Sequence, residues 1–240
     1  MINAVVVLQA RMASTRLPGK VMAKLGEHTL LAHCVRRLQA AQVGPVVVAT
    51  TMRADDDAVE TEARRLGCTV VRGSTDDVLG RFVSASAAVP SRWIVRATAD
   101  NPAVDIESAQ RLLIAVEECG ADYGIEQGHP YGGAVEVIAA STLHRVAELA
   151  TDAYDREHVT PYVRSHADTF RIVVPDVPAD VRRPDLRLTV DTAEDFEFMR
   201  QVLQQAESGS SPAPLHAVIA AADAVRRQRI EMPRETPPAL

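Results

Sequence analysis

The sequence predicts an α/β protein with a mostly parallel central sheet covered by helices. Short runs of apolar and β-branched residues, which are typical of buried strands, alternate with longer segments whose apolar residues recur at helical spacing. This alternation continues over roughly the first 120 residues, and neither an internal repeat nor a low-complexity segment interrupts it. Alternating strands and helices form parallel sheets, because each helix carries the chain back to the starting end of the next strand.

Four strands and four helices are expected in this first part of the chain. The apolar runs predict strands at residues 5–8, 46–49, 68–71 and 93–98. Helical spacing predicts helices at residues 30–38, 55–66, 77–88 and 106–118. The second helix begins in an acidic cluster, because negative side chains interact favourably with the positive N-terminal end of the helix dipole. Gly67 ends this helix.

The pattern changes after Gly120. Residues 124–133 are rich in glycine and polar residues, and residues 134–138 alternate like a half-exposed strand. Further strands are predicted at 170–174 and 186–190, and further helices at 141–150 and 191–207. We expect one domain over residues 1–207 with a small antiparallel subregion at about 124–185, a linker at 208–214, a C-terminal helix at 215–230 and a disordered tail at 231–240.

Composition and charge exclude several classes of protein. The net charge of −6 argues against a broad surface for nucleic acid, so any anion site must be local. No apolar run approaches the roughly 18 residues that cross a bilayer, which argues against a membrane protein. The first strand pattern begins within four residues and leaves no room for a signal peptide, so we expect a cytoplasmic protein. The three cysteines have neither zinc-site nor disulfide spacing.

The loop after the first predicted strand is the main candidate site. It spans residues 9–20 and contains Arg11, Ser14, Arg16 and Lys20. Ligands of open α/β sheets bind at the carboxyl ends of the strands, and cations with a hydroxyl there predict a polyphosphate ligand. Of the 26 cationic residues 24 are arginine, and both lysines lie at or just after this loop, where a compact charge suits a phosphate oxygen.

Two familiar phosphate-binding motifs are absent from this loop. A Walker loop requires a glycine five residues before the Gly19-Lys20 pair, and that glycine is missing. A dinucleotide fingerprint requires three glycines where this loop has one. The loop would therefore bind phosphate through its side chains and backbone amides.

Two aspartates follow predicted strands that are far apart in the sequence. Asp100 comes directly after the strand at 93–98, and Asp191 follows the strand at 186–190. Two carboxylates at one edge of a sheet form a hard oxygen site of the kind that Mg²⁺ prefers. A turn is the alternative role for Asp100, and helix capping is the alternative for Asp191.

Seven segments, in order from the first strand to about residue 200, match the motifs of one family. They are residues 9–20, 48–50, 72–81, 96–102, 135–137, 156–160 and 190–195. The first, Gln9-Ala10-Arg11-Met12-Ala13-Ser14-Thr15-Arg16-Leu17-Pro18-Gly19-Lys20, is the most specific. Together they resemble the SpsF-like branch of the cytidylyltransferases, which are relatives of the enzymes that make CMP-3-deoxy-manno-octulosonate and CMP-acylneuraminate.

The resemblance implies a three-layer α/β sandwich of the glycosyltransferase-A-like nucleotidyltransferase type, commonly a homodimer. Such an enzyme couples a nucleoside triphosphate to a sugar and releases pyrophosphate with Mg²⁺. The implied nucleotide-binding residues are Ala10, Arg11, Ser14, Arg16, Gly19 and Lys20, and the implied metal ligands are Asp100 and Asp191. Arg11, Lys20 and Asp100 are the candidate catalytic residues.

Other polar residues complete the expected site. We expect Thr50 near the base, and Arg72 and Ser74 near the nucleoside. We place the acceptor site and the dimer contact in the glycine-bounded region at 124–185. The candidate acceptor-binding residues are Glu136, Arg156, Glu157 and His158, of which His158 either binds the acceptor, acts as a base or is structural.

The first functional hypothesis is a cytidylyltransferase that transfers CMP from CTP to a sugar acid or related acceptor, in polysaccharide or specialised-metabolite biosynthesis. A guanylyl- or uridylyltransferase acting on a sugar 1-phosphate or phosphonate is one alternative. Two further alternatives are a glycosyltransferase that consumes a nucleotide sugar and a non-catalytic nucleotide-binding protein. The branch usually has a cysteine at the position of Asn101 and a larger apolar residue at that of Ala103, so these two positions leave the acceptor open.

Overall fold

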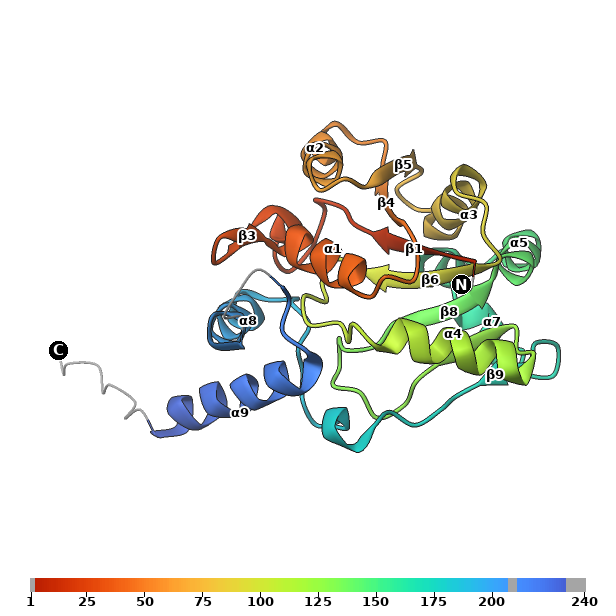
Figure 1. Cartoon of the computed structure of the whole chain (residues 1–240). Coiled ribbons are helices and arrows are strands. Elements are labelled where there is room, and N and C mark those ends of the chain that lie inside the picture. Colours follow the sequence, from red (N-terminus) through yellow and green to blue (C-terminus); the bar gives the residue numbers. More distant parts are fainter. Residues whose placement is uncertain (1–2, 207–210, 232–240) are drawn as a thin grey trace.

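The centre of the protein is a seven-stranded sheet in the order β5-β4-β1-β6-β8-β7-β9 (Figure 1). The computed structural model describes residues 3–206 and 211–231. The strands are β1 (Ala4–Gln9), β4 (Val46–Thr51), β5 (Thr69–Gly73), β6 (Trp93–Thr98), β7 (Tyr123–Ile125), β8 (Glu136–Ala139) and β9 (Ile172–Val173). All pairs are parallel except those that β8 makes with β6 and β7. β2 (Lys24–Leu25) and β3 (His28–Thr29) form a separate antiparallel pair.

Helices cover both faces of this sheet. They are α1 (Leu30–Ala40), α2 (Asp57–Arg65), α3 (Val78–Ala88), α4 (Ser108–Cys119), α5 (Ala140–Leu149), α6 (Ala153–His158), α7 (Pro161–Ser165), α8 (Ala193–Ala206) and α9 (Leu215–Glu231). Short 3-10 turns lie at η1 (Lys20–Met22), η2 (Ala54–Asp56) and η3 (Ala179–Val181).

Strand residues alternate between two buried cores, as their two-residue period requires. Val6 and Leu8 of β1 face a core that includes α1, α2, α4, α8 and α9. Val5 and Val7 face a second core that includes α3, α5 and α7. The predicted three-layer α/β sandwich with a mostly parallel sheet is therefore confirmed.

The structure corrects the sequence prediction in the second half of the chain. The strand predicted as half-exposed at 134–138 is β8, whose first three residues are buried, because α4 and α5 pack on it. The strand predicted at 186–190 is an extended segment outside the sheet, with a single bridge between Arg187 and Tyr131. The sequence did not predict β7, the β2–β3 pair, α6 or α7.

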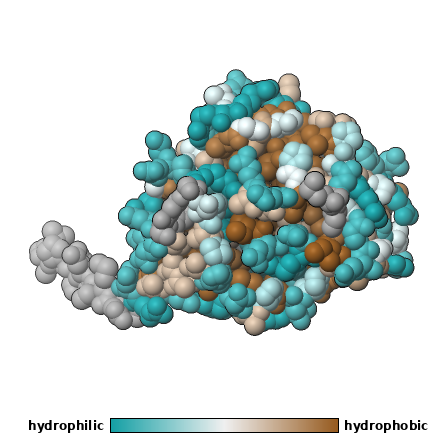
Figure 2. All heavy atoms as spheres, viewed as in Figure 1, coloured by the Kyte–Doolittle hydropathy of each residue, from teal (hydrophilic) through white to brown (hydrophobic). Residues whose placement is uncertain are grey.

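The C-terminal part of the chain packs against the domain through α8 and α9, which contact each other. The last residue of the expected domain, 207, lies outside the described residues, as do residues 208–210 of the expected linker and 232–240 of the expected tail. Over the described ranges, no helix is both long and apolar enough to span a membrane. Figure 2 shows that hydrophilic side chains separate the apolar patches on the viewed face.

Arg37 of α1 ties α9 to the rest of the domain. Its side chain is fully buried, and its Nε donates a hydrogen bond of 2.7 Å to the Val104 carbonyl, which lies between β6 and α4. Its Nη1 donates a hydrogen bond of 2.8 Å to the Ala213 carbonyl, just before α9. One guanidinium therefore satisfies buried carbonyls of two segments that are distant in the sequence.

We expect Arg37→Met to lower the free energy of unfolding by about 2–4 kcal/mol, because both carbonyls lose a charged donor. Urea unfolding followed by circular dichroism measures this change. The matched control is Arg64→Met, since Arg64 is exposed and, within the part of the chain that the structure describes, its guanidinium pairs only with its helix neighbour Glu60. An equal effect of the two substitutions would contradict the role given to Arg37.

Candidate active site

Two adjoining pockets open at the carboxyl ends of β1 and β6. These strands pair as far as Gln9 and Thr98, so the segments that follow them lie side by side. The first pocket, of about 230 Å³, is lined mainly by the loop after β1. The second, of about 690 Å³, extends from the same strand ends to the segment at 125–136. Arg11, Arg16 and Asp100 line both pockets.

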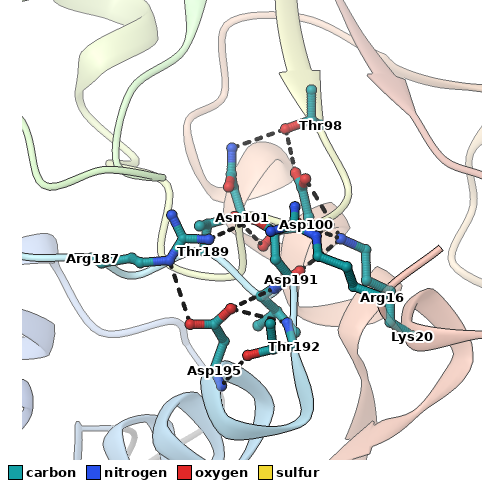
Figure 3. A network of polar contacts seen from close by, with 11 residues as sticks. Arg16, Lys20, Thr98, Asp100, Asn101, Arg187, Thr189, Asp191, Thr192 and Asp195 are labelled. Atoms are coloured by element: carbon teal, nitrogen blue, oxygen red, sulfur yellow. Dashed lines mark hydrogen bonds and ion pairs between the residues drawn. The ribbon is translucent and has the colours of Figure 1, made fainter. Parts of the chain in front are cut away.

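Lys20 lies between the two aspartates that the sequence singled out (Figure 3). Its Nζ is 3.2 Å from Asp191 Oδ1 and 3.7 Å from Asp100 Oδ2, and it donates a hydrogen bond of 2.7 Å to the Val190 carbonyl. Gly19 has a φ of 71°, a left-handed conformation that suits glycine and leads the chain into η1. The Lys20 side chain is only 11% exposed, so its ammonium forms part of the pocket wall.

Asp191 is the most heavily paired carboxylate of the site. Arg16 Nη2 lies 3.0 Å from its Oδ1, and Arg187 Nη2 lies 2.5 Å from its Oδ2. Burial raises the pKa of Asp191, but the hydrogen bond and charge of Lys20, together with Arg187 and Arg16, outweigh burial and hold that pKa below its usual value. Asp191 is therefore ionised at neutral pH.

The helix-capping alternative for Asp191 does not hold. Asp195 Oδ2 accepts hydrogen bonds from the backbone nitrogens of Asp191 and Thr192, at 3.0 and 2.9 Å. The Thr192 hydroxyl accepts one from the Asp195 nitrogen at 3.1 Å, which completes a reciprocal cap at the start of α8. Because Thr192 and Asp195 supply this cap, the Asp191 carboxylate is left to face the cations.

Asp100 is fixed by its neighbours on both sides. The Thr98 hydroxyl donates to its Oδ1 at 2.5 Å, and the Asn101 amide in turn donates to that hydroxyl at 2.9 Å. The Asp100 carbonyl accepts hydrogen bonds from the Val190 nitrogen at 2.8 Å and from the Thr189 hydroxyl at 3.2 Å. These bonds hold the segment at 189–190 against the end of β6 and so bring Asp191 to Asp100.

The remaining residues of the first loop divide between two sides. Ala10 and Ser14 line the first pocket, and the Ala10 nitrogen donates to the Ala49 carbonyl at 3.1 Å, which fixes the start of the loop. Arg16 also lines this pocket, although its side chain is 63% exposed. Gly19 lines a shallow hollow on the outer side of the loop instead, so its contribution to the first pocket is the turn that positions Lys20.

Arg81 of α3 is a site residue that the sequence analysis did not single out. It is buried, lines the first pocket, and donates hydrogen bonds to the carbonyls of Ser74 and Thr75. Arg11 also reaches the Thr75 carbonyl, at 3.4 Å. Burial lowers the pKa of Arg81, and the nearby charge of Arg11 adds to this effect. The motif at 72–81 contained Arg81, but its helical position gave no sign that it faces the strand ends.

Besides Gly19, three predicted nucleotide-binding residues line neither pocket. Thr50 is fully buried within β4. Arg72 is held on the outer side of β5 by Asp57 and Glu60, at 2.6 and 2.8 Å, and by backbone carbonyls. The Ser74 hydroxyl accepts a hydrogen bond from the Asp76 nitrogen within its own turn, at 3.3 Å. The structure thus gives Arg72 and Ser74 structural partners and does not bring them to the cleft.

The polar groups of two of the four predicted acceptor-binding residues are already bound to other side chains of the protein. Glu136 lines the second pocket, but it is buried and accepts hydrogen bonds from Arg96 at 2.8 Å, Tyr123 at 3.0 Å and Thr160 at 3.1 and 3.2 Å. Arg156 lines neither pocket. It pairs with Asp77, the N-cap residue of α3, at 2.7 Å.

Glu157 and His158, at the end of α6, do face the second pocket. Glu157 pairs with Arg11 at 3.2 Å and so joins α6 to the first loop. The next residue, Val159, has a φ of 73°, which is rare for a β-branched side chain. The Thr160 nitrogen donates to the His158 carbonyl across it at 2.9 Å, and this tight turn ends α6 beside the pocket.

Glu126 and His129 line the far end of the second pocket and were also missed. His129 Nε2 is 2.8 Å from Glu126 Oε2, which also accepts from Ser108 and Arg111 at 2.6 and 2.9 Å. Asp105, Glu126 and His129 each place a potential metal-ligand atom within 4.8 Å of the others, but the Arg111 guanidinium pairs with both acids. The available sequence signal was the Glu-x-x-His spacing of these two residues within the glycine-rich segment 124–133.

Comparison with solved structures defines the class of protein. This chain is a nucleotidyltransferase: it is similar to a cytidylyltransferase from Leptospira borgpetersenii serovar Hardjo-bovis over 98% of this chain and 99% of that one, with a TM-score of 0.84 and 26% identity. It shares the fold of a CMP:2-keto-3-deoxy-manno-octonic acid synthetase solved with CTP, with a TM-score of 0.65 and 19% identity over 84% of this chain and 98% of that one.

The sequence narrows this class further. The chain belongs to the cytidylyltransferase family, whose model matches residues 5–211. It is 37% identical to the spore coat polysaccharide biosynthesis protein SpsF of Bacillus subtilis strain 168 over 206 residues, which cover 83% of this chain and 86% of that protein. The resemblance inferred from the seven segments is therefore confirmed.

The buried acid at the far end of the second pocket predicts a specific pH dependence of stability. Burial raises the pKa of Glu126, but hydrogen bonds from His129, Arg111 and Ser108 outweigh it and lower the pKa from its ordinary 4.5 to about 2. A carboxyl whose pKa is lower in the folded state contributes stability that is present above pH 4.5 and is lost as the pH falls toward 2.

We expect Glu126→Gln to flatten the dependence of unfolding free energy on pH between 4.5 and 2, because the substituted side chain no longer titrates. Denaturant unfolding at a series of pH values measures this slope. Glu107→Gln is the control, since Glu107 also lies beside Arg111, at 3.6 Å, but is 74% exposed. An unchanged slope in Glu126→Gln would refute the assignment.

Proposed function

We propose that this protein is a Mg²⁺-dependent cytidylyltransferase that transfers CMP from CTP to a sugar acid or related acceptor and releases pyrophosphate. The observation that carries the proposal is the meeting of Lys20 with Asp100 and Asp191 where two arginine-lined pockets adjoin. Membership of the cytidylyltransferase family supports CTP as the nucleotide. The fold shared with a synthetase solved with CTP supports the same assignment.

The charged residues where the two pockets meet divide into cations for the triphosphate and acids for the metal. Arg11, Arg16 and Lys20 are proposed to bind phosphate oxygens, with Arg81 adding positive charge to the same pocket. Asp100 and Asp191 fit Mg²⁺, because both are oxygen donors and both already contact a single positive group, the Lys20 ammonium. Bound Mg²⁺ would supply charge neutralisation of the triphosphate.

The reaction itself requires no nucleophilic side chain. An acceptor oxygen held in the second pocket attacks the α-phosphorus in line, a new P–O bond forms, and the bond to the β-phosphate oxygen breaks to release pyrophosphate. The arginines and Lys20 stabilise the negative charge that develops on this leaving group. Glu157 and His158 lie on the acceptor side of the cleft, where either can accept the proton of an attacking hydroxyl.

The chemistry of the first pocket also bears on the glycosyltransferase alternative. A glycosyltransferase needs acids near a central strand, but it has less use for a cluster of four cations, Arg11, Arg16, Lys20 and Arg81, around one pocket. We further propose a homodimer that works in the cytoplasm, in polysaccharide or specialised-metabolite biosynthesis. The name of the SpsF relative supports the first of these two pathways.

The test of this function is pyrophosphate release from each of the four nucleoside triphosphates, with a panel of sugar acids, sugar 1-phosphates and phosphonates as acceptors. We expect release that requires both CTP and one acceptor class. Faster release with GTP or UTP would replace the cytidylyl assignment by a guanylyl or uridylyl one. Binding of CTP without release by any acceptor would instead indicate a non-catalytic protein.

We expect Asp100→Asn to lower metal-dependent pyrophosphate release roughly 100-fold or more, because a neutral amide holds a cation poorly while the fold is kept. Asp185→Asn is the matched control, since Asp185 pairs with Arg183 on the surface and is 61% exposed. Thermal melting compares the stability of the two variants. Wild-type turnover in Asp100→Asn would refute the metal-binding role.

A further inference from the structure

The Lys20 ammonium lies at the point where the two proposed metal ligands meet. It contacts Asp191 Oδ1 at 3.2 Å and Asp100 Oδ2 at 3.7 Å, and the Val190 carbonyl anchors it at 2.7 Å (Figure 3). Mg²⁺ binds carboxylate oxygens at about 2.0–2.1 Å. An ion bridging these two oxygens would therefore have to displace the ammonium, because the two cations cannot share one gap between the same oxygens.

Charge within this cluster is already balanced. Asp191 pairs with Arg16 and Arg187 in addition to Lys20, and Arg187 Nε also lies 3.4 Å from Asp195 Oδ1. The cluster contains three carboxylates, Asp100, Asp191 and Asp195, and three cations, Arg16, Lys20 and Arg187. A divalent cation that approaches without an anion therefore meets no net negative charge.

Lys20 also borders the pocket proposed for the triphosphate. It lines the first pocket together with Arg11, Arg16 and Arg81. A lysine side chain has a flexible four-carbon stem and three donors that can turn to new partners. The highly charged triphosphate would compete with Asp191 for this ammonium and would leave the two carboxylates without it.

We propose that Lys20 is a stand-in cation for the metal site, so that the divalent ion gains access to Asp100 and Asp191 only when the triphosphate draws the ammonium away. Binding of the metal and of the nucleotide is then positively coupled, and by thermodynamic reciprocity each tightens the other, typically about 5- to 150-fold. The inference rests on the proposed function for the identity of the metal ligands. It goes beyond that function by giving Lys20 a role in the nucleotide-free protein.

The test measures Mn²⁺ binding to the nucleotide-free protein by electron paramagnetic resonance of the free ion, which needs no turnover. We expect the wild-type protein to bind Mn²⁺ weakly. We expect Lys20→Met to bind it at least about tenfold more tightly, because the variant keeps an apolar stem but loses the ammonium. Lys24→Met is the matched control, since Lys24 is the only other lysine, is exposed and lines neither pocket. It should behave as wild type.

Two further variants keep the result interpretable. Lys20→Arg retains the positive charge, so we expect this variant to exclude Mn²⁺ as the wild type does. A difference between Lys20→Arg and Lys20→Met would then reflect the lost charge and not the substitution itself. Circular dichroism checks that each variant is folded. The double variant Lys20→Met with Asp100→Asn should lose the gained Mn²⁺ affinity, which assigns it to this carboxylate pair. Calorimetry in the presence of chelator should show that wild type binds CTP without metal.

Equal Mn²⁺ affinity of wild type and a folded Lys20→Met would overturn the stand-in role. Tight Mn²⁺ binding by nucleotide-free wild type would overturn the coupling. Both outcomes are distinct from failure of the proposed function, which shows as absence of pyrophosphate release from every triphosphate. Gain of Mn²⁺ affinity in Lys20→Met would support the inference even if the preferred nucleotide proved to be GTP or UTP.

Discussion

The hydrogen bond from the Lys20 ammonium to the Val190 carbonyl joins the two ends of the domain, since 170 residues separate its partners. It works together with the backbone bond from the Val190 nitrogen to the Asp100 carbonyl. The pairing of β1 with β6 sets where the first loop and Asp100 emerge, and these two bonds then fix the third segment against them. The Asp100 carbonyl also accepts a hydrogen bond from the Thr189 hydroxyl, so the segment keeps its place beside Asp100 even when the Lys20 ammonium turns to another partner.

The sequence was sufficient to predict the parallel half of the fold and the three segments that meet in the cleft. Buried parallel strands read as short apolar runs, and their carboxyl ends must share one edge, so Lys20 and Asp100 could be placed together. The segment at 186–190 was misread as a strand because its alternating apolar residues do pack into the core, yet its partners are carbonyl groups of loops. Such long-range partners leave no local signature.

Arginine roles were the least predictable feature, because a guanidinium in the right motif can bind either a ligand or a neighbouring acid. Arg72 and Arg81 belong to one motif, but Asp57 and Glu60 of α2 hold Arg72 outside, while Arg81 on α3 turns to the first pocket. Arg81 is buried, and among the described residues it donates to the carbonyls of Ser74 and Thr75 and forms no ion pair with a carboxylate. Its positive charge is therefore not neutralised by a neighbouring acid.

Lys20 and Arg111 each lie between two acids beside the cleft, and comparing them indicates why the Lys20 cluster suits an exchangeable metal better. Arg111 pairs with Asp105 and Glu126 through several short hydrogen bonds, and it lines neither of the two pockets described above. Lys20 makes one close bond to a carbonyl and two longer contacts to acids, and it borders a pocket lined by arginines. A point charge on a flexible stem can be withdrawn by an arriving anion, whereas a guanidinium bound at several atoms stays. The choice of lysine in an arginine-rich chain therefore has a physical consequence at this one position.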